Sequence, residues 1–423
     1  MELFIGKGGV GKTTLACATA IAYARSGQRV LLASLDQAHS LGDALGFRFR
    51  RAAGAVPEVA SVQTGLDVIE VDSLALLEDR FRQVLLMVSG AGQEHGIDLG
   101  ALDPAELTGL PGVQELLALL EITQFTKDSR WDVIVVDCPP SADMLRIITA
   151  PDTLLGYLER VWPAHTRALS VGIDLRRAVL SVAVEQIVDT VTEARDLLAD
   201  TARTSARLVT AAEHVAIAES ARVRSAAALL GLRLSAILVN KVLPEVPPPD
   251  PGYGDGQAPH PAVQWYFNRR GEQIDVIAEL RKRMRGISVQ VVGHAGPEPV
   301  GLSSLSALSY AVDASGDWVG SGPVLMLGTD ADGVLPTSSG PMVRLESGAG
   351  VHSVFAMRMH LPVVDPSTLQ LGRVEDDLIV GADGVRRRLR LAPVLRRCTV
   401  DAAELDGEQL VIRFRPDPQV WPQ

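Results

Sequence analysis

The chain has 423 residues and a formal net charge of −11 at pH 7, so it is long enough for two or three domains with full hydrophobic cores. The acidic balance disfavours broad binding to nucleic acid or anionic membranes, and we expect no nucleic-acid partner. The sequence opens on a short apolar run without a basic leader and contains no run of about 18 apolar residues, so we expect a cytoplasmic protein. The three cysteines lie far apart with no C-x-x-C pair, which argues against a disulfide framework and favours core positions.

A glycine-rich segment at residues 6–14, GKGGVGKTT, follows an apolar run at residues 3–5 and opens a stretch with a helical pattern. Such a turn points successive backbone N–H groups at phosphate oxygens, at a helix end that already carries partial positive charge. In this pattern Lys12 binds the β- and γ-phosphates as a catalytic group, and the Thr13 hydroxyl coordinates Mg²⁺. A chance glycine turn is the alternative, which the spacing of Lys and Thr disfavours. The predicted nucleotide-binding residues are Gly8, Gly9, Val10, Gly11, Lys12, Thr13 and Thr14.

Short runs rich in β-branched residues alternate with longer helical stretches along the first 300 residues. This alternation predicts an α/β fold with a doubly wound, mostly parallel sheet covered by helices on both faces. Ligands in such sheets bind beyond the carboxyl ends of the strands, so the loops after those ends are the expected place for chemistry. The predicted strands lie at residues 3–5, 30–34, 68–71, 133–136, 208–210, 236–239 and 289–292.

A second lysine, Lys7, stands five positions before Lys12. This arrangement resembles the deviant Walker A motif of the SIMIBI nucleoside triphosphatases, which include MinD/ParA, the nitrogenase iron protein, the arsenical-pump ATPase (ArsA) and the tail-anchored-protein targeting ATPase. In that group the corresponding lysine reaches across a dimer interface to the partner's nucleotide. The resemblance implies a homodimer in which Lys7 supplies positive charge in trans to the transferring phosphoryl group. An ordinary exposed loop lysine is the alternative.

Residues 36–44, DQAHSLGDA, are similar to the switch I segment D-P-A-H-x-L-x-D-A of the ArsA and targeting branch. The resemblance implies that Asp36 lies beside the γ-phosphate and orients or deprotonates the attacking water. It also places His39 and Asp43 in switch I, although either could simply cap or pack the following helix. An acid at position 36 could instead hold a ribose in a dinucleotide site, but that site favours G-x-G-x-x-G. Gln37 replaces the family's proline.

A hydrophobic run at residues 131–137 ends in Asp137 and is followed by CPPSADMLR at residues 138–146. This resembles the Walker B strand and switch II, where the family has D-T-A-P-T-G-H-T-L-R. The resemblance implies that Asp137 holds the hydration shell of Mg²⁺. It also implies a switch loop containing Pro140 and Ser141 that responds to loss of the γ-phosphate.

Asn240 stands at the end of the predicted strand 236–239. In the family the asparagine at this place reads adenine, because its amide offers both a donor and an acceptor. The loop 294–299, with Pro297, is then expected to close over the base. An asparagine that only caps a turn is the alternative.

The proline- and glycine-rich stretch at residues 244–261 reads as a mobile insertion. The eukaryotic targeting ATPases carry a zinc-binding C-x-x-C after this point, and this sequence lacks it, so we expect no zinc. The metalloid-binding cysteines of the arsenical pump do not match Cys17, Cys138 or Cys398.

Two stretches between the nucleotide motifs, residues 74–125 and 152–206, have a helical pattern and are predicted as helical insertions. In the targeting ATPases the equivalent insertions form a hydrophobic groove for a client helix. The second insertion carries an apolar stripe that fits either a groove or ordinary core, and it lacks the methionines typical of adaptable client surfaces. The stripe consists of Leu180, Val184, Ile187, Val188, Val191, Leu197 and Leu198.

The carboxy-terminal part changes from a helical to a β pattern. We predict an ATPase domain at residues 1–312, a linker with one short strand at 313–350, and an all-β sandwich at 351–423. The sandwich resembles the small-heat-shock-protein (α-crystallin) domain appended to some bacterial and plastid ArsA-like ATPases. Its predicted strands lie at residues 354–361, 368–371, 377–380, 387–391 and 409–414.

The resemblance covers nearly the whole chain and implies an ATPase that uses ATP and Mg²⁺ and dimerises when nucleotide is bound. The leading hypothesis for its purpose is a chaperone-like or targeting role toward hydrophobic or membrane-associated protein segments. One alternative is the motor subunit of an anion or metalloid efflux system. Another is a MinD/ParA-like positioning switch.

Overall fold

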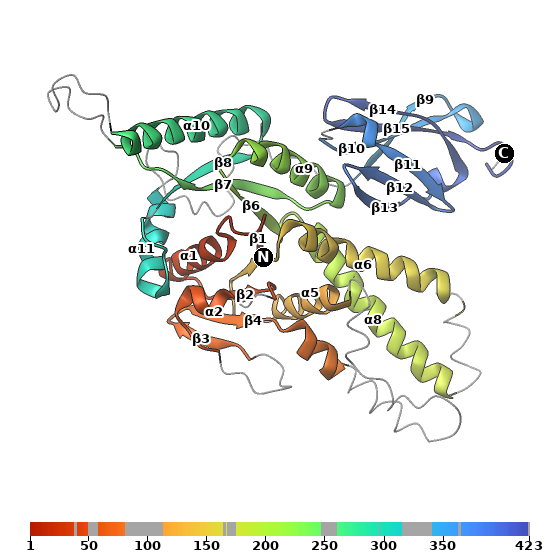
Figure 1. The fold of residues 1–423 in the computed structure, drawn as a ribbon. Coiled ribbons are helices and arrows are strands. Elements are labelled where there is room, and N and C mark those ends of the chain that lie inside the picture. The colour runs from red at the N-terminus through yellow and green to blue at the C-terminus, as the bar shows by residue number, and fades with distance from the viewer. Residues whose placement is uncertain are drawn as a thin grey trace.

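The computed structural model describes residues 1–37, 40–49, 58–80, 113–163, 166, 175–246, 260–294, 296–314, 341–362 and 365–421. Its centre is an eight-stranded sheet with the order β3-β4-β2-β5-β1-β6-β7-β8 (Figure 1). All neighbouring strands are parallel except β3 and β4, which confirms the predicted mostly parallel sheet. The strands are β1 (Glu2–Gly6), β2 (Val30–Ser34), β3 (Ala60–Gln63), β4 (Leu66–Glu70), β5 (Val133–Asp137), β6 (Ser205–Ala211), β7 (Leu234–Val242) and β8 (Ser288–Gly293).

Helices cover both faces of this sheet because successive side chains of each buried strand point to opposite sides. Leu3 and Ile5 of β1 belong to one core and Phe4 to the other. The Phe4 side is covered by α1 (Lys12–Arg25), α2 (Ser40–Leu45) and α11 (Gly301–Ala314). The other side is covered by α5 (Val113–Phe125), α6 (Ser141–Val161), α8 (Leu175–Ala199), α9 (His214–Leu230) and α10 (Pro261–Arg283). None of the helices in the described part is long and apolar enough to cross a membrane.

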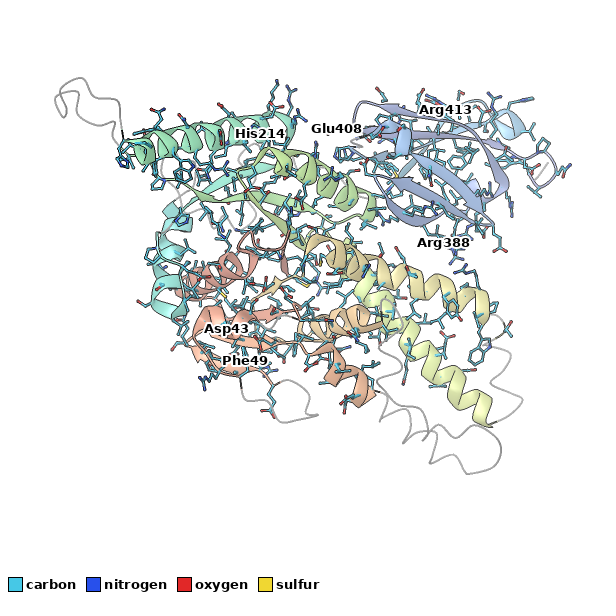
Figure 2. The ribbon with its side chains drawn as sticks, viewed as in Figure 1. Asp43, Phe49, His214, Arg388, Glu408 and Arg413 are labelled. Atoms are coloured by element: carbon cyan, nitrogen blue, oxygen red, sulfur yellow. The ribbon has the colours of Figure 1, made fainter. Side chains whose placement is uncertain are left out.

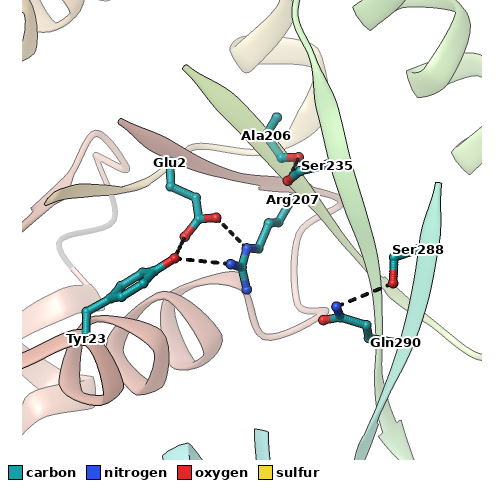
Figure 3. Close-up of polar contacts among 7 residues, drawn as sticks. All are labelled: Glu2, Tyr23, Ala206, Arg207, Ser235, Ser288 and Gln290. Atoms are coloured by element: carbon teal, nitrogen blue, oxygen red, sulfur yellow. Dashed lines mark hydrogen bonds and ion pairs between the residues drawn. The ribbon is translucent and has the colours of Figure 1, made fainter. Parts of the chain in front are cut away.

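A buried polar network fixes β1 at the end that lies away from the glycine-rich loop (Figure 3). The Arg207 guanidinium of β6 forms an ion pair of 2.6 Å with Glu2, the first residue of β1. The Tyr23 hydroxyl of α1 donates to the other Glu2 oxygen at 3.1 Å and accepts from Arg207 at 3.3 Å. A buried charge pair costs less when its remaining donors and acceptors are also paired. Here the tyrosine pairs one further atom of each partner, while Nη1 of Arg207 has no hydrogen-bond partner in the described part of the chain. The network therefore joins α1 and two central strands in one register.

The described parts of both predicted insertions are mostly helical, and their helices pack together. Residues 73–80 are helical, residues 81–112 lie outside the described part, and α5 packs with α6 and α8 around Leu116, Ala150 and Val191. The apolar stripe of α8 is mixed, because Val191, Leu197 and Leu198 are buried whereas Ile187 is 47% exposed. The side chain of Leu180 lies outside the described part.

The carboxy-terminal part is an antiparallel β sandwich, as predicted. One sheet has the order β14-β15-β10-β9 and the other β11-β12-β13. Their inner faces form a separate core with Phe414, Ile412 and Val380 fully buried. The strands are β9 (Met342–Ser347), β10 (Val354–His360), β11 (Gln370–Val374), β12 (Asp377–Ala382), β13 (Val385–Arg390), β14 (Cys398–Asp406) and β15 (Gln409–Pro416).

Two strands have no counterpart in the sequence prediction, and a third lies within the predicted linker. Strand β14 has no predicted counterpart, because almost all of its side chains are exposed and it lacks the apolar alternation of a half-buried strand. Strand β9 corresponds to the one short strand predicted within the linker 313–350, and it pairs with β10 as part of the sandwich. Strand β3 has only four residues and lies partly exposed at the edge of the sheet, so the sequence has no apolar pattern there that would predict a strand. The range 315–340 lies outside the described part.

The sandwich is held against α9 and α6 by side chains that cross between the two parts. Arg387 of β13 donates to the carbonyl oxygen of Leu229, the penultimate residue of α9, at 2.9 Å. Leu229 itself is fully buried in the sandwich core. Arg224 of α9 forms an ion pair of 2.7 Å with Glu408, which Figure 2 labels at the edge of the sandwich beside α9. Burial lowers the pKa of Arg387, and the charge of Asp152 on α6 opposes that shift.

We expect Arg387→Met to loosen this interface and lower the free energy of unfolding by about 1–3 kcal/mol, the usual effect of leaving a buried hydrogen-bonding group unpaired. Hydrogen exchange should be faster at the amides of Gly231 and Leu232, which close the end of α9. Arg390→Met is the matched control, because Arg390 is exposed on the same strand. Equal exchange rates in the two variants would contradict this view of the interface.

Candidate functional site

The glycine-rich loop leaves β1 at the centre of the sheet and enters α1 at Lys12. Two of its glycines are required by space and conformation. A Cβ at Gly6 would lie 2.2 Å from the carbonyl oxygen of Val209, and a Cβ at Gly11 (φ 95°) would lie 2.4 Å from Nδ2 of Asn240. Only glycine fits both places, so the backbone can make the turn that directs N–H groups into the mouth of the loop.

Asp137 ends β5, next to the loop, and is completely buried. Its Oδ2 accepts hydrogen bonds from the hydroxyls of Thr13 at 2.8 Å and Ser34 at 3.4 Å. Burial raises the pKa of this carboxyl to about 6; the hydrogen bond from Thr13 and the charge of Lys12 lower it, and the charge of Asp36 raises it further. The charge of Asp36 therefore acts on the Asp137 carboxyl, whose Oδ2 is hydrogen-bonded to the Thr13 hydroxyl.

This arrangement fits a magnesium ion bound together with a phosphorylated ligand. Oδ1 of Asp137 is buried and has no hydrogen-bond partner in the described part of the chain. That part also contains no cluster of three or more His, Cys, Asp or Glu side chains that could hold a metal alone. Mg²⁺ usually keeps several water molecules and binds through one or two protein groups plus substrate phosphates. The Thr13 hydroxyl and an Asp137-bound water are suited to that role.

The two lysines of the loop differ in position. Lys12 is 6% exposed, and its ammonium donates to the carbonyl oxygen of Lys7 at 3.1 Å. The Lys7 residue is exposed. Lys12 therefore faces the interior of the loop, and Lys7 is accessible to a second molecule.

The segment predicted as switch I reaches the loop through Ser40, the first residue of α2. The hydroxyls of Ser40 and Thr13 lie 3.2 Å apart. The backbone N–H of Asp36 donates to Ser34 at 3.2 Å, which places Asp36 beside the Asp137 side of the site. Asp43 is exposed on α2, and His39 lies outside the described residues.

Gln37, which replaces the family's proline, connects this segment to α5. Its side-chain amide donates to Gln114 at 3.1 Å and lies 3.5 Å from the hydroxyl of Ser73. Pattern alone could not reveal this contact, because Gln114 lies 77 residues away in sequence.

Only part of the segment predicted as the switch II loop is irregular. Pro140 is the N-terminal cap residue of α6 and Ser141 its first residue, so the chain is helical from Ser141 onward. A proline beside the first helical turn loses no intrahelical hydrogen bond, which makes this a favourable place to begin. The irregular part is residues 138–140.

Asn240 and its neighbour contact the loop from β7. The Asn240 amide donates to the carbonyl oxygen of Val10 at 2.9 Å, and the Lys241 ammonium donates to that of Gly9 at 3.1 Å. Sequence reasoning missed Lys241, because in a regular strand it would point away from Asn240. Pro297 lies exposed in the loop after β8, at the same carboxyl edge of the sheet.

Comparison with known proteins gives a consistent result. The sequence profile of the anion-transporting ATPase family (ArsA) matches residues 1–309, and that of the HSP20-like domain found in ArsA matches residues 353–414. Protein Rv2184c of Mycobacterium tuberculosis is 43% identical over 430 residues, covering 100% of this chain and 97% of that protein. A putative arsenical pump-driving ATPase of Prosthecochloris vibrioformis is 29% identical over 326 residues, 74% and 75% of the two chains. ATPase GET3 of Zygosaccharomyces rouxii is 30% identical over 254 residues, 56% and 71% of the two chains.

The raised pKa of Asp137 predicts how stability depends on pH without nucleotide or metal. The folded protein keeps the Asp137 proton up to about pH 6, whereas the unfolded chain loses it near its ordinary pKa of 3.8. The contribution of this group to stability therefore falls as pH rises from about 4 to about 6. We expect Asp137→Asn to be more stable than wild type at pH 7, by about 3 kcal/mol at most, with the difference vanishing near pH 4.

Urea unfolding from pH 2 to pH 7 measures this difference. Asp132→Asn is a control with the opposite sign, because hydrogen bonds from Arg29 hold the pKa of that exposed carboxyl at about 2. It should lose stability at pH 7 and approach wild type toward pH 2. If Asp137→Asn were no more stable than wild type at pH 7, the conclusion that burial disfavours the charge of Asp137 would be wrong.

Proposed function

The chain belongs to the ArsA family of anion-transporting ATPases, and on this basis we propose that it is a Mg²⁺-dependent ATPase that works as a nucleotide-bound homodimer. The observation that carries the proposal is the buried Asp137 carboxylate, with one oxygen on the Thr13 hydroxyl and the other unpaired, at the mouth of the glycine-rich loop. A metal held by a nucleotide would give that unpaired oxygen a partner through a bound water.

Each group of the site has a role in this proposal. The loop N–H groups and the Lys12 ammonium hold the β- and γ-phosphates, and Thr13 and Asp137 hold the metal, which neutralises charge on the phosphates. Asp36 orients the attacking water and accepts its proton. Lys7 of the second protomer completes the site by supplying positive charge to the transferring phosphoryl group.

For the purpose of hydrolysis we favour a chaperone or targeting role toward apolar protein segments. Helices α6 and α8 carry large apolar side chains that are largely exposed: Tyr157 at 56%, Val161 at 64% and Val182 at 54%. Gln37 links the switch I segment to α5, which packs with both helices, so a change at the γ-phosphate has a short path to this surface. A nucleotide-controlled client surface is consistent with these contacts.

An anion or metalloid efflux motor is the second candidate, favoured by relatives named as putative arsenical pump-driving ATPases. The three cysteines are free and buried, which is unfavourable for a thiolate site open to a metalloid. Stimulation of hydrolysis by arsenite or antimonite, abolished by cysteine substitution, would favour this candidate. Sedimentation with anionic vesicles only in ATP would instead favour a MinD/ParA-like positioning switch.

The client role predicts a peptide affinity that depends on nucleotide state. Asp36→Asn should bind ATP like wild type but hydrolyse it at least ~10²-fold more slowly, because it lacks the base, and so hold the protein in its ATP form. Fluorescence anisotropy of a labelled apolar helical peptide should then give different dissociation constants for Asp36→Asn with ATP and wild type with ADP.

Two control variants accompany this experiment. Asp128→Asn changes a partly exposed acid paired with Arg130 and should hydrolyse ATP at the wild-type rate. Val161→Glu, on the exposed face of α6, should weaken peptide binding without changing hydrolysis. Equal peptide affinity in the ATP and ADP forms would rule out the client role while leaving the ATPase proposal intact.

A further inference from the structure

The end of β7 directs two consecutive side chains at the same loop, which a regular strand cannot do because successive side chains point to opposite faces. The pairing register of β7 with β8 shifts between Val239 and Val242, and Lys241 has the left-handed backbone conformation, with φ 60°. This irregularity turns Asn240 and Lys241 toward the glycine-rich loop together. Left-handed backbone is unfavourable for lysine, so its presence here needs a compensating contact.

Helix α10 holds that conformation in place. Gln273 of α10 is 5% exposed, and its amide donates to the carbonyl oxygen of Lys241 at 3.2 Å. Its side-chain oxygen accepts the backbone N–H of Leu243 at 2.8 Å. The N–H of Lys241 donates in turn to the side-chain oxygen of Asn240 at 2.9 Å. The irregular end of β7 is therefore tied down on both sides of Lys241.

Three side chains together pair three carbonyl groups of the loop. Lys12 donates to the carbonyl of residue 7, Lys241 to that of Gly9 and Asn240 to that of Val10. When the carbonyl groups of such a loop are held by hydrogen bonds, its N–H groups stay directed at the phosphate site. Of the three, Lys241 alone is exposed.

We propose that Lys241 is a positioning residue that holds the glycine-rich loop in its phosphate-binding form. It fixes the loop at Gly9 and adds a positive charge beside that residue. The assignment rests on the proposed ATPase function and deepens it, because it makes Lys241 a determinant of affinity for nucleotides with a β-phosphate. It predicts little effect on the hydrolysis step, since Lys241 contacts the loop backbone and none of the groups assigned to the attacking water.

Isothermal titration of ADP and of adenosine, with ATPase kinetics, tests this assignment. Lys241→Met keeps the aliphatic stem and removes the donor, and should raise the ADP dissociation constant and the ATP KM about threefold to tenfold. We expect kcat to change by less than about twofold and adenosine affinity to stay at the wild-type value, because the loop binds phosphates rather than the base. Lys241→Arg restores a charged donor and should recover most of the affinity.

Two further variants separate the ammonium from the backbone. Lys241→Gly relieves the left-handed conformation but removes the donor, so it should unfold at a higher temperature than Lys241→Met and still bind ADP weakly. Lys282→Met, an exposed lysine of α10, should bind ADP like wild type.

Three outcomes overturn the assignment. They are wild-type ADP affinity in Lys241→Met, an equal loss of adenosine affinity, or a fall in kcat with unchanged KM. In each of these the wild type still hydrolyses ATP, so the proposed function stands. A wild type that binds no ADP overturns both the proposed function and the role of Lys241.

Discussion

The rest of the site depends on Asp137. Its carboxylate is buried at the end of a central strand, and neighbouring groups stabilise its charge only in part. Burial disfavours its charge, and the negative charge of Asp36 acts in the same direction. The Thr13 and Ser34 hydroxyls and the nearby Lys12 ammonium offset this only in part, because one oxygen keeps no partner among the described residues. A divalent cation brought by a nucleotide would stabilise both carboxylates at once. The fold thus maintains an unfavourable group at the place where binding can relieve it, as functional sites often do.

The surrounding structure keeps this group in register with the glycine-rich loop. At the far end of β1, the Glu2, Tyr23 and Arg207 network fixes the strand that delivers the loop. At the near end, β7 and α10 hold the loop carbonyls through Asn240 and Lys241. Restraint at both ends explains how a glycine-rich segment, whose backbone has the most freedom to lose, keeps one conformation.

Helix α6 connects the site to the sandwich. Helix α6 begins four residues after Asp137 and contains Pro151, where the missing N–H interrupts the helical hydrogen bonds. The next residue, Asp152, is the acid whose charge acts on Arg387 of the sandwich. The sandwich also takes Leu229 of α9 into its own core. Through these contacts the carboxy-terminal sandwich packs against α6 and α9.

The sequence predicted the parts of the structure that depend on local pattern. The alternation around Leu3, Phe4 and Ile5 and the spacing of the loop residues identify the sheet and the site, because burial on two faces and a phosphate-binding turn each leave a local signature. The features that the sequence could not predict depend on contacts between segments that lie far apart in the sequence. Strand β14 is polar and exposed and is held by pairing with β15, and the contact of Lys241 requires a shift of register that no local pattern records.

The most direct test of the account is a mixing experiment with two inactive chains. Lys7→Ala lacks the lysine proposed to act in trans and keeps Asp36, whereas Asp36→Asn keeps Lys7 and lacks the proposed base. In a mixed dimer one of the two sites has both groups, and half of randomly formed dimers are mixed, so an equal mixture should recover about a quarter of the wild-type ATPase rate. A chain carrying both substitutions should give no recovery with either partner. If each variant were inactive alone and the equal mixture stayed inactive while mixed dimers formed, Lys7 would act within its own chain and the account of a shared site would be wrong.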